Sequence, residues 1–275
     1  MKKLLFTGTL IVFLCLSLSA QSGLKIVLEE NNGEYTIISS QGKTKELIIP
    51  GMVNDKPITA IGEGAFTQKG LTLVTIPESV TVIGEGAFSY NELRTLVIGN
   101  GVQTIGTKAF FNNRINDLTI GTGVQVIGMG AFAGNELVRV TIPDSVTDIE
   151  PYAFFNNKLT AVVIPGNVST IGEGAFSSNH LYSVSIGDRV EVIGDGAFYN
   201  NRLTSISIPG NVSALGKRVF ESILTKKGSV PPIDYLDETG ELLYTTSTNF
   251  DTYFSSTGKR PGQYTFSRDG WVYGN

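Results

Sequence analysis

The apolar positions of this chain recur with a period of 22 residues. The clearest marker is the dipeptide Ala-Phe, which ends in a degraded copy, Val219-Phe220, and whose phenylalanines are Phe66, Phe88, Phe110, Phe132, Phe154, Phe176 and Phe198. A unit of this length is too short to enclose a hydrophobic core by itself, so its apolar side chains must be buried against the units before and after it. The pattern predicts a repeat solenoid over residues 61–220.

Each unit reads approximately Asn-x-Leu-x-x-Val-x-Ile-Pro/Gly-x-x-Val-x-x-Ile-Gly-x-Gly-Ala-Phe-x-x. In its first half, apolar positions such as Leu96 and Ile98 alternate with small or polar ones, as in a short strand with one buried face. Strands that lie one turn apart are expected to pair in parallel at about 4.8 Å. We therefore predict a continuous parallel sheet along the concave side of the solenoid.

The second half of the unit, Ile-Gly-x-Gly-Ala-Phe, is too short and too rich in glycine for a helix of normal length. We predict one tight turn there on the convex side, 3₁₀ or barely α, with its Ile and Phe side chains pointing inward. Together the two halves describe a leucine-rich-repeat type of solenoid with units of 22 residues.

An asparagine stands two residues before the first apolar position of each strand. We call this set the ladder asparagines: Asn91, Asn113, Asn135, Asn157, Asn179 and Asn201. A buried asparagine must satisfy two donors and an acceptor, and a stack of asparagines can do so on the backbone of neighbouring turns. A structural ladder is favoured over a ligand-binding role.

These repeats resemble a known family, the BspA-like leucine-rich repeats, also called the Treponema pallidum type. The resemblance is carried by blocks such as Val74-Thr75-Ile76-Pro77-Glu78-Ser79-Val80-Thr81-Val82-Ile83-Gly84-Glu85-Gly86-Ala87-Phe88, and it covers about residues 46–220. The family often has cysteine or asparagine at the inner polar position, whereas this chain always has asparagine. The resemblance implies a curved, right-handed solenoid and a role in bacterial surface adhesion or host-protein binding.

A second period of 44 residues lies on top of the first. The residue after Ala-Phe is aromatic in every other unit, at Phe111, Phe155 and Tyr199. The residue after each ladder asparagine alternates in charge at first, and the set is Glu92, Arg114, Glu136, Lys158, His180 and Arg202. We interpret the charges as an exposed ladder that sets register, and the aromatic row as packing along the convex edge. The alternative for the aromatic row is an exposed binding stripe.

The concave face is where repeat proteins usually bind their partners. Its outward positions are small and nearly neutral, and we expect the charged pair Asp117 and Arg139 to neutralise each other. The candidate ligand-binding residues are Thr75, Val97, Asp117, Thr119, Arg139, Thr141, Val163, Ser185 and Ser207. Threonine and valine are also common in strands that bind nothing, so this pattern alone does not distinguish a binding face from a solvated sheet.

Both ends of the solenoid depart from the repeat, because an open end would expose the core and a strand edge. Residues 21–60 are predicted to form an N-terminal β cap and a partial repeat. Residues 221–275 are predicted to form a linker, around Lys226–Pro232, and a β-hairpin cap. In that hairpin Gln263–Phe266 and Trp271–Tyr273 flank an Asp-Gly turn signal. Contact with a glycan or partner is the alternative to capping for this tail.

Residues 1–20 have the layout of a secretory signal peptide, with Lys2 and Lys3 before an apolar run and small residues after it. A membrane anchor is the alternative, but the run falls short of the roughly 20 apolar residues that a spanning helix needs. Cys15 is the only cysteine. Lipidation of Cys15 is a further alternative, although the residue before it is not small. Cleavage after it would leave no disulfide, thiolate metal site or cysteine nucleophile.

Loss of Lys2 and Lys3 leaves 19 basic against 25 acidic residues and a formal net charge of −6. There is no basic stripe, which argues against nucleic acid or an anionic membrane surface as a partner. A β-helix-like carbohydrate-active enzyme is the alternative of another class. However, the outward strand positions supply no acidic cluster, and His180 has no catalytic neighbour in the repeat.

The sequence thus predicts an exported, non-catalytic bacterial protein without a metal or cofactor. It is expected at the cell surface or secreted, and to bind a host matrix or envelope protein through its concave face. A periplasmic interaction scaffold is the alternative. The oligomeric state and the identity of the ligand are left open.

Overall fold

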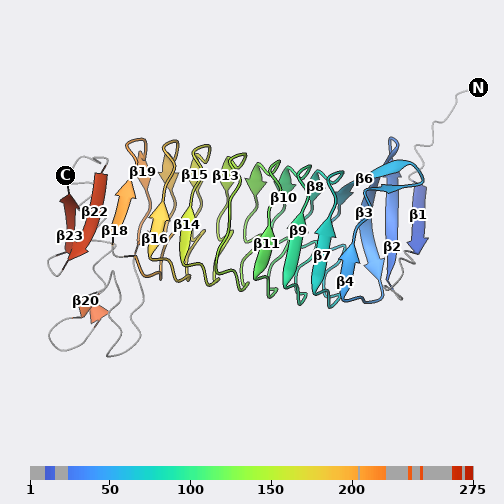
Figure 1. Ribbon diagram of the computed structural model, residues 1–275, viewed down its shortest axis with the longest axis horizontal. Coiled ribbons are helices and arrows are strands. Elements are labelled where there is room, and N and C mark those ends of the chain that lie inside the picture. The colour runs from blue at the N-terminus through green and yellow to red at the C-terminus, as the bar shows by residue number, and fades with distance from the viewer. Residues whose placement is uncertain are drawn as a thin grey trace, which may run out of the picture.

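The computed structural model describes residues 10–15, 24–203, 205–220, 235–236, 242–243, 262–267 and 270–274. Figure 1 shows the described turns stacked side by side along the long axis of the molecule. The structure is a parallel-strand solenoid of about 8 turns, and no helix occurs among the described residues. The predicted repeat solenoid is therefore confirmed. The predicted linker around residues 226–232 lies outside the described residues.

All turns but one contribute a strand to a first row, and each contributes a strand to a second row, which has two residues in every case except β6. The first row consists of β4 (Glu46–Ile48), β7 (Leu73–Ile76), β9 (Thr95–Ile98), β11 (Asp117–Thr119), β14 (Ala161–Val163), β16 (Ser183–Ser185) and β18 (Ser205–Ile208). The second row consists of β6 (Lys56–Ile61), β8 (Val82–Ile83), β10 (Thr104–Ile105), β12 (Val126–Ile127), β13 (Asp148–Ile149), β15 (Thr170–Ile171), β17 (Val192–Ile193) and β19 (Ala214–Leu215). All pairs within the two rows are parallel.

The second row is continuous, but the first row is interrupted. β4, β7, β9 and β11 form one sheet, β14 pairs with β16, and β18 belongs to a third sheet with β22 and β23, while the turn between β11 and β14 forms no strand. In that turn no backbone N–H of Arg139, Val140 or Thr141 donates to a neighbouring turn. Pro143, two residues after Thr141, has no N–H to donate along the stack, but Pro77 and Pro165 stand at the same repeat position after β7 and β14, so the proline alone does not explain the interruption. The expectation of a continuous sheet on this side is corrected accordingly.

The glycine-rich half of each unit forms two overlapping tight turns rather than a helical turn. In the first repeat, Ala65 N donates to Gly62 O at 3.4 Å and Thr67 N donates to Gly64 O at 3.0 Å. The alternate N–H groups point along the stack, and Phe66 N donates to Ala87 O of the next turn at 2.8 Å. Because these donors serve the neighbouring turn, they are not available for a 3₁₀ or α ladder.

One continuous core runs through the stack. Its centre is a column of phenylalanine rings, one per turn from Phe66 to Phe220, with adjacent ring centroids 5.1–5.8 Å apart and ring planes within 11° of parallel. Ile83 and its equivalents are buried beside this column, together with the inward residues of the first row, Leu96 and Ile98. The Ile and Phe side chains point inward as the sequence predicts.

The close spacing of the turns explains why glycine follows every second-row strand except β13, which is followed by Glu150. A Cβ atom on Gly84 would lie 2.8 Å from the carbonyl carbon of Gly62 and 2.9 Å from Ile61 O. Real Cβ atoms do not approach backbone this closely, so a side chain there would push the turns apart.

The N-terminal end is closed by strands that do not follow the repeat. β2 (Lys25–Asn31) pairs antiparallel with β3 (Glu34–Gln41), which continues the second row by pairing in parallel with β6. β5 (Met52–Val53) folds back on the start of β6. β1 (Leu10–Cys15) pairs antiparallel with β2, and it lies in the predicted signal peptide, whose other residues are outside the described part. Signal cleavage stays a prediction.

At the C-terminal end, the predicted hairpin is present. β22 (Gly262–Ser267) pairs antiparallel with β23 (Gly270–Gly274), and β22 also pairs antiparallel with β18 of the last turn of the first row. A further short pair is formed by β20 (Tyr235–Leu236) and β21 (Leu242–Leu243). The hairpin thus covers the edge that the last first-row strand would otherwise expose. Its contribution to stability stays a prediction.

Candidate functional site

The candidate residues of the concave face lie on the outer side of the first row, which we call the strand face. Val97, Asp117, Thr119, Val163, Ser185 and Ser207 are exposed and lie on β9, β11, β14, β16 and β18, while Thr75 on β7 is half-buried. Arg139 and Thr141 are also exposed, but they lie in the turn that forms no strand.

The strand register brings these residues together in two groups. Val97 is in register with Thr75 on one side and with Thr119 on the other. Val163 is in register with Ser185. The interrupted turn separates the two groups, and Ser207 lies on β18, which belongs to a third sheet, so the strand face is not one uniform row.

Asp117 and Arg139 do not neutralise each other as expected. No ion pair joins them in the described part of the chain. The reason is the interruption of the first row, since Arg139 is not held in register beside Asp117. Both side chains are exposed, and each presents its charge to solvent on the strand face.

An apolar patch next to the interruption was not predicted from the sequence. We call it the Tyr182 patch, and it consists of Val138, Val163 and Tyr182, which are 48%, 66% and 56% exposed. These residues belong to three consecutive turns, linked by the bonds from Thr160 N to Val138 O at 3.2 Å and from Tyr182 N to Thr160 O at 3.0 Å. The signal in the sequence is the column after the first strand leucine, which holds Arg94, Asn116, Val138, Thr160 and Tyr182.

The ladder asparagines are buried, and their amides are engaged with the backbone. Asn135 is representative: its Nδ2 donates to Phe110 O of the preceding turn and to Phe132 O of its own turn, both at 3.0 Å. Its Oδ1 accepts from Ile115 N at 3.0 Å. Because the donors and the acceptor are all engaged with the backbone of the same and the preceding turn, these side chains have no group left for a ligand.

The charge ladder is only partly formed. Lys158 pairs with Glu136 of the turn before it at 3.1 Å, but Glu92 pairs with Lys45 at 3.2 Å instead of Arg114. The hydrogen bond from Lys45 lowers the pKa of the exposed Glu92 carboxyl. Long exposed side chains can pair with any of several partners, so such pairs add little to stability.

His180 is not placed for catalysis or metal binding. Partial burial lowers the pKa of its imidazole, and the positive charges of Arg202 and Lys158 lower it further. Both effects favour the neutral form of the imidazole, whose charged neighbours are cations. In the described residues no group of three or more His, Cys, Asp or Glu side chains could hold a metal ion.

The aromatic row lies half-buried on the turn edge, the edge formed by the glycine-rich half of each unit. Phe111 makes an edge contact with Tyr90 at 5.4 Å between ring centroids, and Phe155 makes one with Tyr152 at 5.9 Å. The Arg218 guanidinium lies 4.7 Å from the centroid of the Tyr199 ring. A hydrogen bond to Glu173 raises the pKa of the Tyr152 hydroxyl. These contacts account for packing along the edge, as the sequence indicated.

None of the described residues belongs to a helix with the length and hydrophobicity that crossing a bilayer requires.

Comparison with known proteins agrees with the geometry. The family model described as BspA type leucine rich repeat region (6 copies) matches residues 59–136 and 103–227. No curated protein matches the chain.

Several solved structures are similar to this one. A leucine rich cell surface protein from Faecalibacterium prausnitzii A2-165 is 25% identical over 92% of this chain and 59% of its own, with a TM-score of 0.51. A leucine-rich repeat protein from Bacteroides ovatus is 23% identical over 72% of this chain and 55% of its own, with a TM-score of 0.56. The T. pallidum leucine rich repeat protein is 18% identical over 72% of this chain and 87% of its own, with a TM-score of 0.50.

The chain thus spans less than two thirds of the length of the F. prausnitzii protein. The family match covers more than half of the chain, and it coincides with the stacked turns, the phenylalanine column and the ladder asparagines. The chain belongs to the BspA type leucine rich repeat family.

Proposed function

We propose that this is an exported, non-catalytic protein of the bacterial cell surface that binds a protein partner or a host surface through its strand face. The observation that carries the proposal is the Tyr182 patch, where one apolar side chain in each of three consecutive turns is 48–66% exposed. Exposed aromatic and aliphatic side chains with few charges are typical of the centre of a protein interface.

The surroundings of the patch suit such an interface. Threonine and serine hydroxyls at Thr119, Thr141 and Ser185 provide hydrogen-bonding groups without charge, and Asp117 and Arg139 stand at the rim as isolated charges of opposite sign. A partner that spans both groups of residues on the strand face would contact several turns, so affinity would be spread over several repeats. A surface location is also supported by the similarity to the F. prausnitzii cell surface protein.

A periplasmic interaction scaffold is the second candidate, and it would use the same face. In this case the protein would lie on the periplasmic side of the outer membrane and not on the cell surface. A β-helix-like carbohydrate-active enzyme is not proposed, because the exposed positions of the strand face carry hydroxyl and apolar groups where such an enzyme needs clustered carboxylates.

The proposal is tested by placing lysines on the strand face. The triple variant Thr119→Lys, Thr141→Lys and Val163→Lys is expected to weaken binding to a responsive host matrix protein by at least about 100-fold, because unpaired ammonium groups buried in an interface cost several kcal/mol. The measurement is surface plasmon resonance of the full chain on a panel of purified, immobilised matrix proteins. The thermal melting curve should be unchanged, since all three side chains are exposed.

The matched control adds the same charge to another side of the solenoid, with Val82→Lys, Gln103→Lys and Gln125→Lys. These three residues are exposed and lie on or just before strands of the second row. Control and wild type are expected to bind equally. Undiminished binding of the strand-face variant, or an equal loss in the control, would remove the strand face as the binding site.

A further inference from the structure

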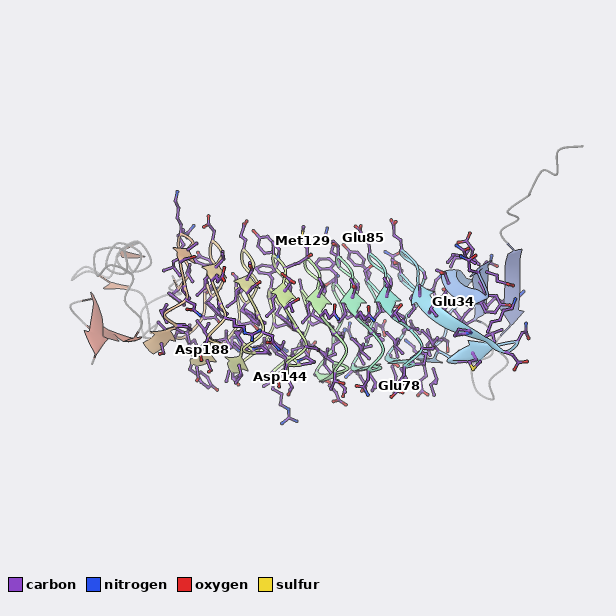
Figure 2. The ribbon with its side chains drawn as sticks, turned by 90° about the horizontal axis from the view of Figure 1, so that it is seen from above. Glu34, Glu78, Glu85, Met129, Asp144 and Asp188 are labelled. Atoms are coloured by element: carbon purple, nitrogen blue, oxygen red, sulfur yellow. The ribbon has the colours of Figure 1, made fainter. Side chains whose placement is uncertain are left out.

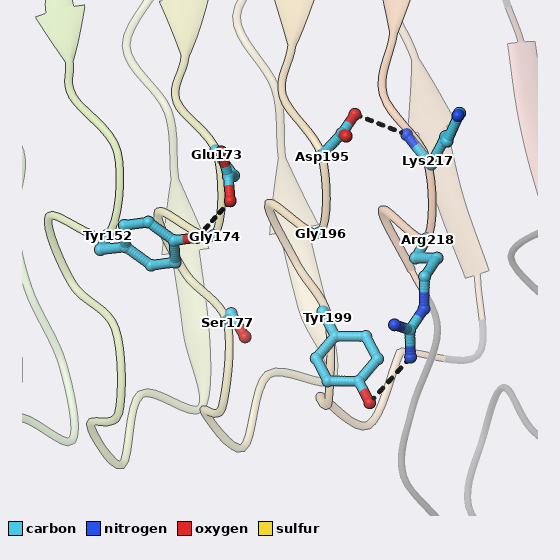
Figure 3. A pocket seen from close by; sticks show the side chains of 9 residues that line it. All are labelled: Tyr152, Glu173, Gly174, Ser177, Asp195, Gly196, Tyr199, Lys217 and Arg218. Carbon is cyan, nitrogen blue, oxygen red and sulfur yellow. Dashed lines mark hydrogen bonds between the residues drawn. The ribbon is translucent and has the colours of Figure 1, made fainter.

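The turn edge carries two hollows of similar size. One, of about 300 Å³, lies over Gly64, Gly86 and their neighbours in the first turns. The other, of about 340 Å³, lies over Gly174 and Gly196 in the last turns and is drawn in Figure 3. We call them the first groove and the second groove.

The two grooves are built from the same kinds of residue at the same repeat positions. Seven of the nine residues of the second groove lie 110 residues, or five units of 22, after a residue of the first, and only Tyr152 and Lys217 have no such counterpart. The acids Glu63 and Glu85 correspond to Glu173 and Asp195, the hydroxyl of Thr67 to that of Ser177, and the base Lys108 to Arg218. The turns between them have Thr107, Met129 and Pro151 at the acidic position. The acids, the hydroxyl group and the base of the groove therefore recur together after five units, and they do not occur in every unit.

The backbone explains why the hollows form where they do. The glycine of each tight turn has a positive φ, of 58° and 57° at Gly64 and Gly86, and 57° and 59° at Gly174 and Gly196. Two such glycines in succession leave the floor of the groove without side chains. The next turn has Lys108 or Arg218 in the same conformation, with φ of 53° and 56°, and its long side chain forms a wall.

The second groove holds its polar groups in fixed positions. As Figure 3 shows, the Tyr152 hydroxyl donates to Glu173 at one end, and Asp195 accepts from Lys217 N at 2.9 Å. At the other end Arg218 Nη2 donates to the Tyr199 hydroxyl at 3.1 Å. The site is therefore bounded by two aromatic rings with carboxylates between them.

The first groove has a similar layout with more open acids. Tyr90 and Phe111 form its aromatic side, and Thr67 Oγ1 donates to Gly86 O at 2.8 Å. The carboxylates of Glu63 and Glu85 form no hydrogen bond or ion pair within the described part of the chain. They are exposed and can accept hydrogen bonds from a ligand.

The mixture of groups selects a ligand class. In the second groove Glu173 and Asp195 are balanced by Lys217 and Arg218, and in the first groove the two acids exceed Lys108 by one charge, so neither groove has the positive excess that an anion needs or more than one excess negative charge. A neutral ligand rich in hydroxyl groups fits both, since it can donate to the carboxylates, accept from the ammonium or guanidinium group and lay its C–H face on an aromatic ring. We propose that the two grooves bind neutral oligosaccharide.

From the spacing of the grooves we further infer that one saccharide chain binds to both. Five turns at about 4.8 Å each separate equivalent groups by about 24 Å along the stack. Glu85 and Met129, which share one repeat position, project from the same edge in Figure 2, opposite Glu78, Asp144 and Asp188. A saccharide chain that spans this distance binds bivalently, whereas a shorter one occupies a single groove. This site lies away from the strand face and does not rest on the proposed function.

The test uses the full chain and an array of neutral hexose and N-acetylhexosamine oligomers, from disaccharides to chains long enough to span the two grooves. Calorimetry then gives the Kd of the strongest binder. The variant Glu173→Gln with Asp195→Asn is expected to weaken binding of the long chain by about 10- to 100-fold, and Glu63→Gln with Glu85→Gln by a similar factor, because either change removes one of two linked sites. All four changes together should abolish binding.

Met129→Gln is the matched control, since Met129 is 43% exposed at the same repeat position but lines neither groove. It should bind like the wild type, as should the strand-face lysine variant, which separates this site from the proposed function. The proposal is overturned if no neutral oligomer binds, or if the four changes leave binding intact. It is also overturned if an oligolysine peptide or heparin binds instead and is lost in the groove variants.

Discussion

Replacement of Phe154 by alanine is expected to lower the free energy of unfolding by about 3–5 kcal/mol, which is the usual cost of truncating a fully buried phenylalanine. The Phe154 ring stacks between Phe132 and Phe176, with centroids 5.4 and 5.2 Å away. Truncation leaves a cavity in the middle of the column, and the rings on both sides cannot close it because their own turns hold them in place. Urea denaturation followed by circular dichroism measures the change.

The next residue in the chain provides a matched control. Phe155 is half-buried on the turn edge, where it contacts Tyr152. Phe155→Ala removes the same number of atoms, but it should cost clearly less, about 1–2 kcal/mol, because most of the side chain's surroundings remain hydrated. Equal losses for Phe154→Ala and Phe155→Ala would show that the column does not carry the stability that its burial indicates.

Replacement of Asn135 by alanine is expected to lower the free energy of unfolding by about 2–4 kcal/mol. The change leaves the buried N–H of Ile115 without its acceptor and removes one donor each from Phe110 O and Phe132 O. An unsatisfied buried donor costs about 1–3 kcal/mol, and the lost side-chain volume adds to it. Thermal melting of the purified full chain provides the measurement.

Asn116 is the control for this prediction, because it is exposed and lies in the same turn as Ile115. Asn116→Ala should change stability by no more than about 0.5 kcal/mol. A melting temperature for Asn135→Ala that equals the one for Asn116→Ala would contradict a stabilising role for the ladder asparagines.

The sequence predicts the solenoid well because every turn must bury apolar side chains at the same positions. The spacing of Phe66, Phe88 and their equivalents requires a buried column, and the alternation around Leu96 and Ile98 requires an outward strand position at Val97. Both follow from local periodicity and from the need to bury apolar side chains. The outward positions of the strand face are therefore predictable from the sequence alone.

Other features depend on contacts between turns, which a single repeat does not encode. Two-residue strands such as β8 are too short to show the alternation of buried and exposed residues that is typical of a strand. From the sequence alone, the second-row strands therefore cannot be distinguished from part of a tight turn. The non-helical turns follow from N–H groups that bond along the stack, as Phe66 N does. The interruption, and the absence of an ion pair between Asp117 and Arg139, arise because the Arg139–Thr141 segment donates no backbone hydrogen bond to a neighbouring turn.

The two grooves are also hard to predict from the sequence, because their matching residues lie several repeats apart. Glu63 and Glu173 are 110 residues apart, and neither is unusual in its own repeat. Only the hollow over paired glycines shows that acid, hydroxyl and base form one site. The exposure of Tyr182 is hard to predict for a simpler reason, because the other residues of its column, such as Arg94 and Asn116, are polar and give no apolar pattern.

The proposed action of this chain at the cell surface has a direct test, which is protease accessibility on intact bacterial cells that produce it. A known periplasmic protein serves as the internal control, and the reaction is followed by immunoblot. We expect digestion of this protein while the control survives. Protection until the envelope is opened would contradict the surface location and favour the periplasmic scaffold.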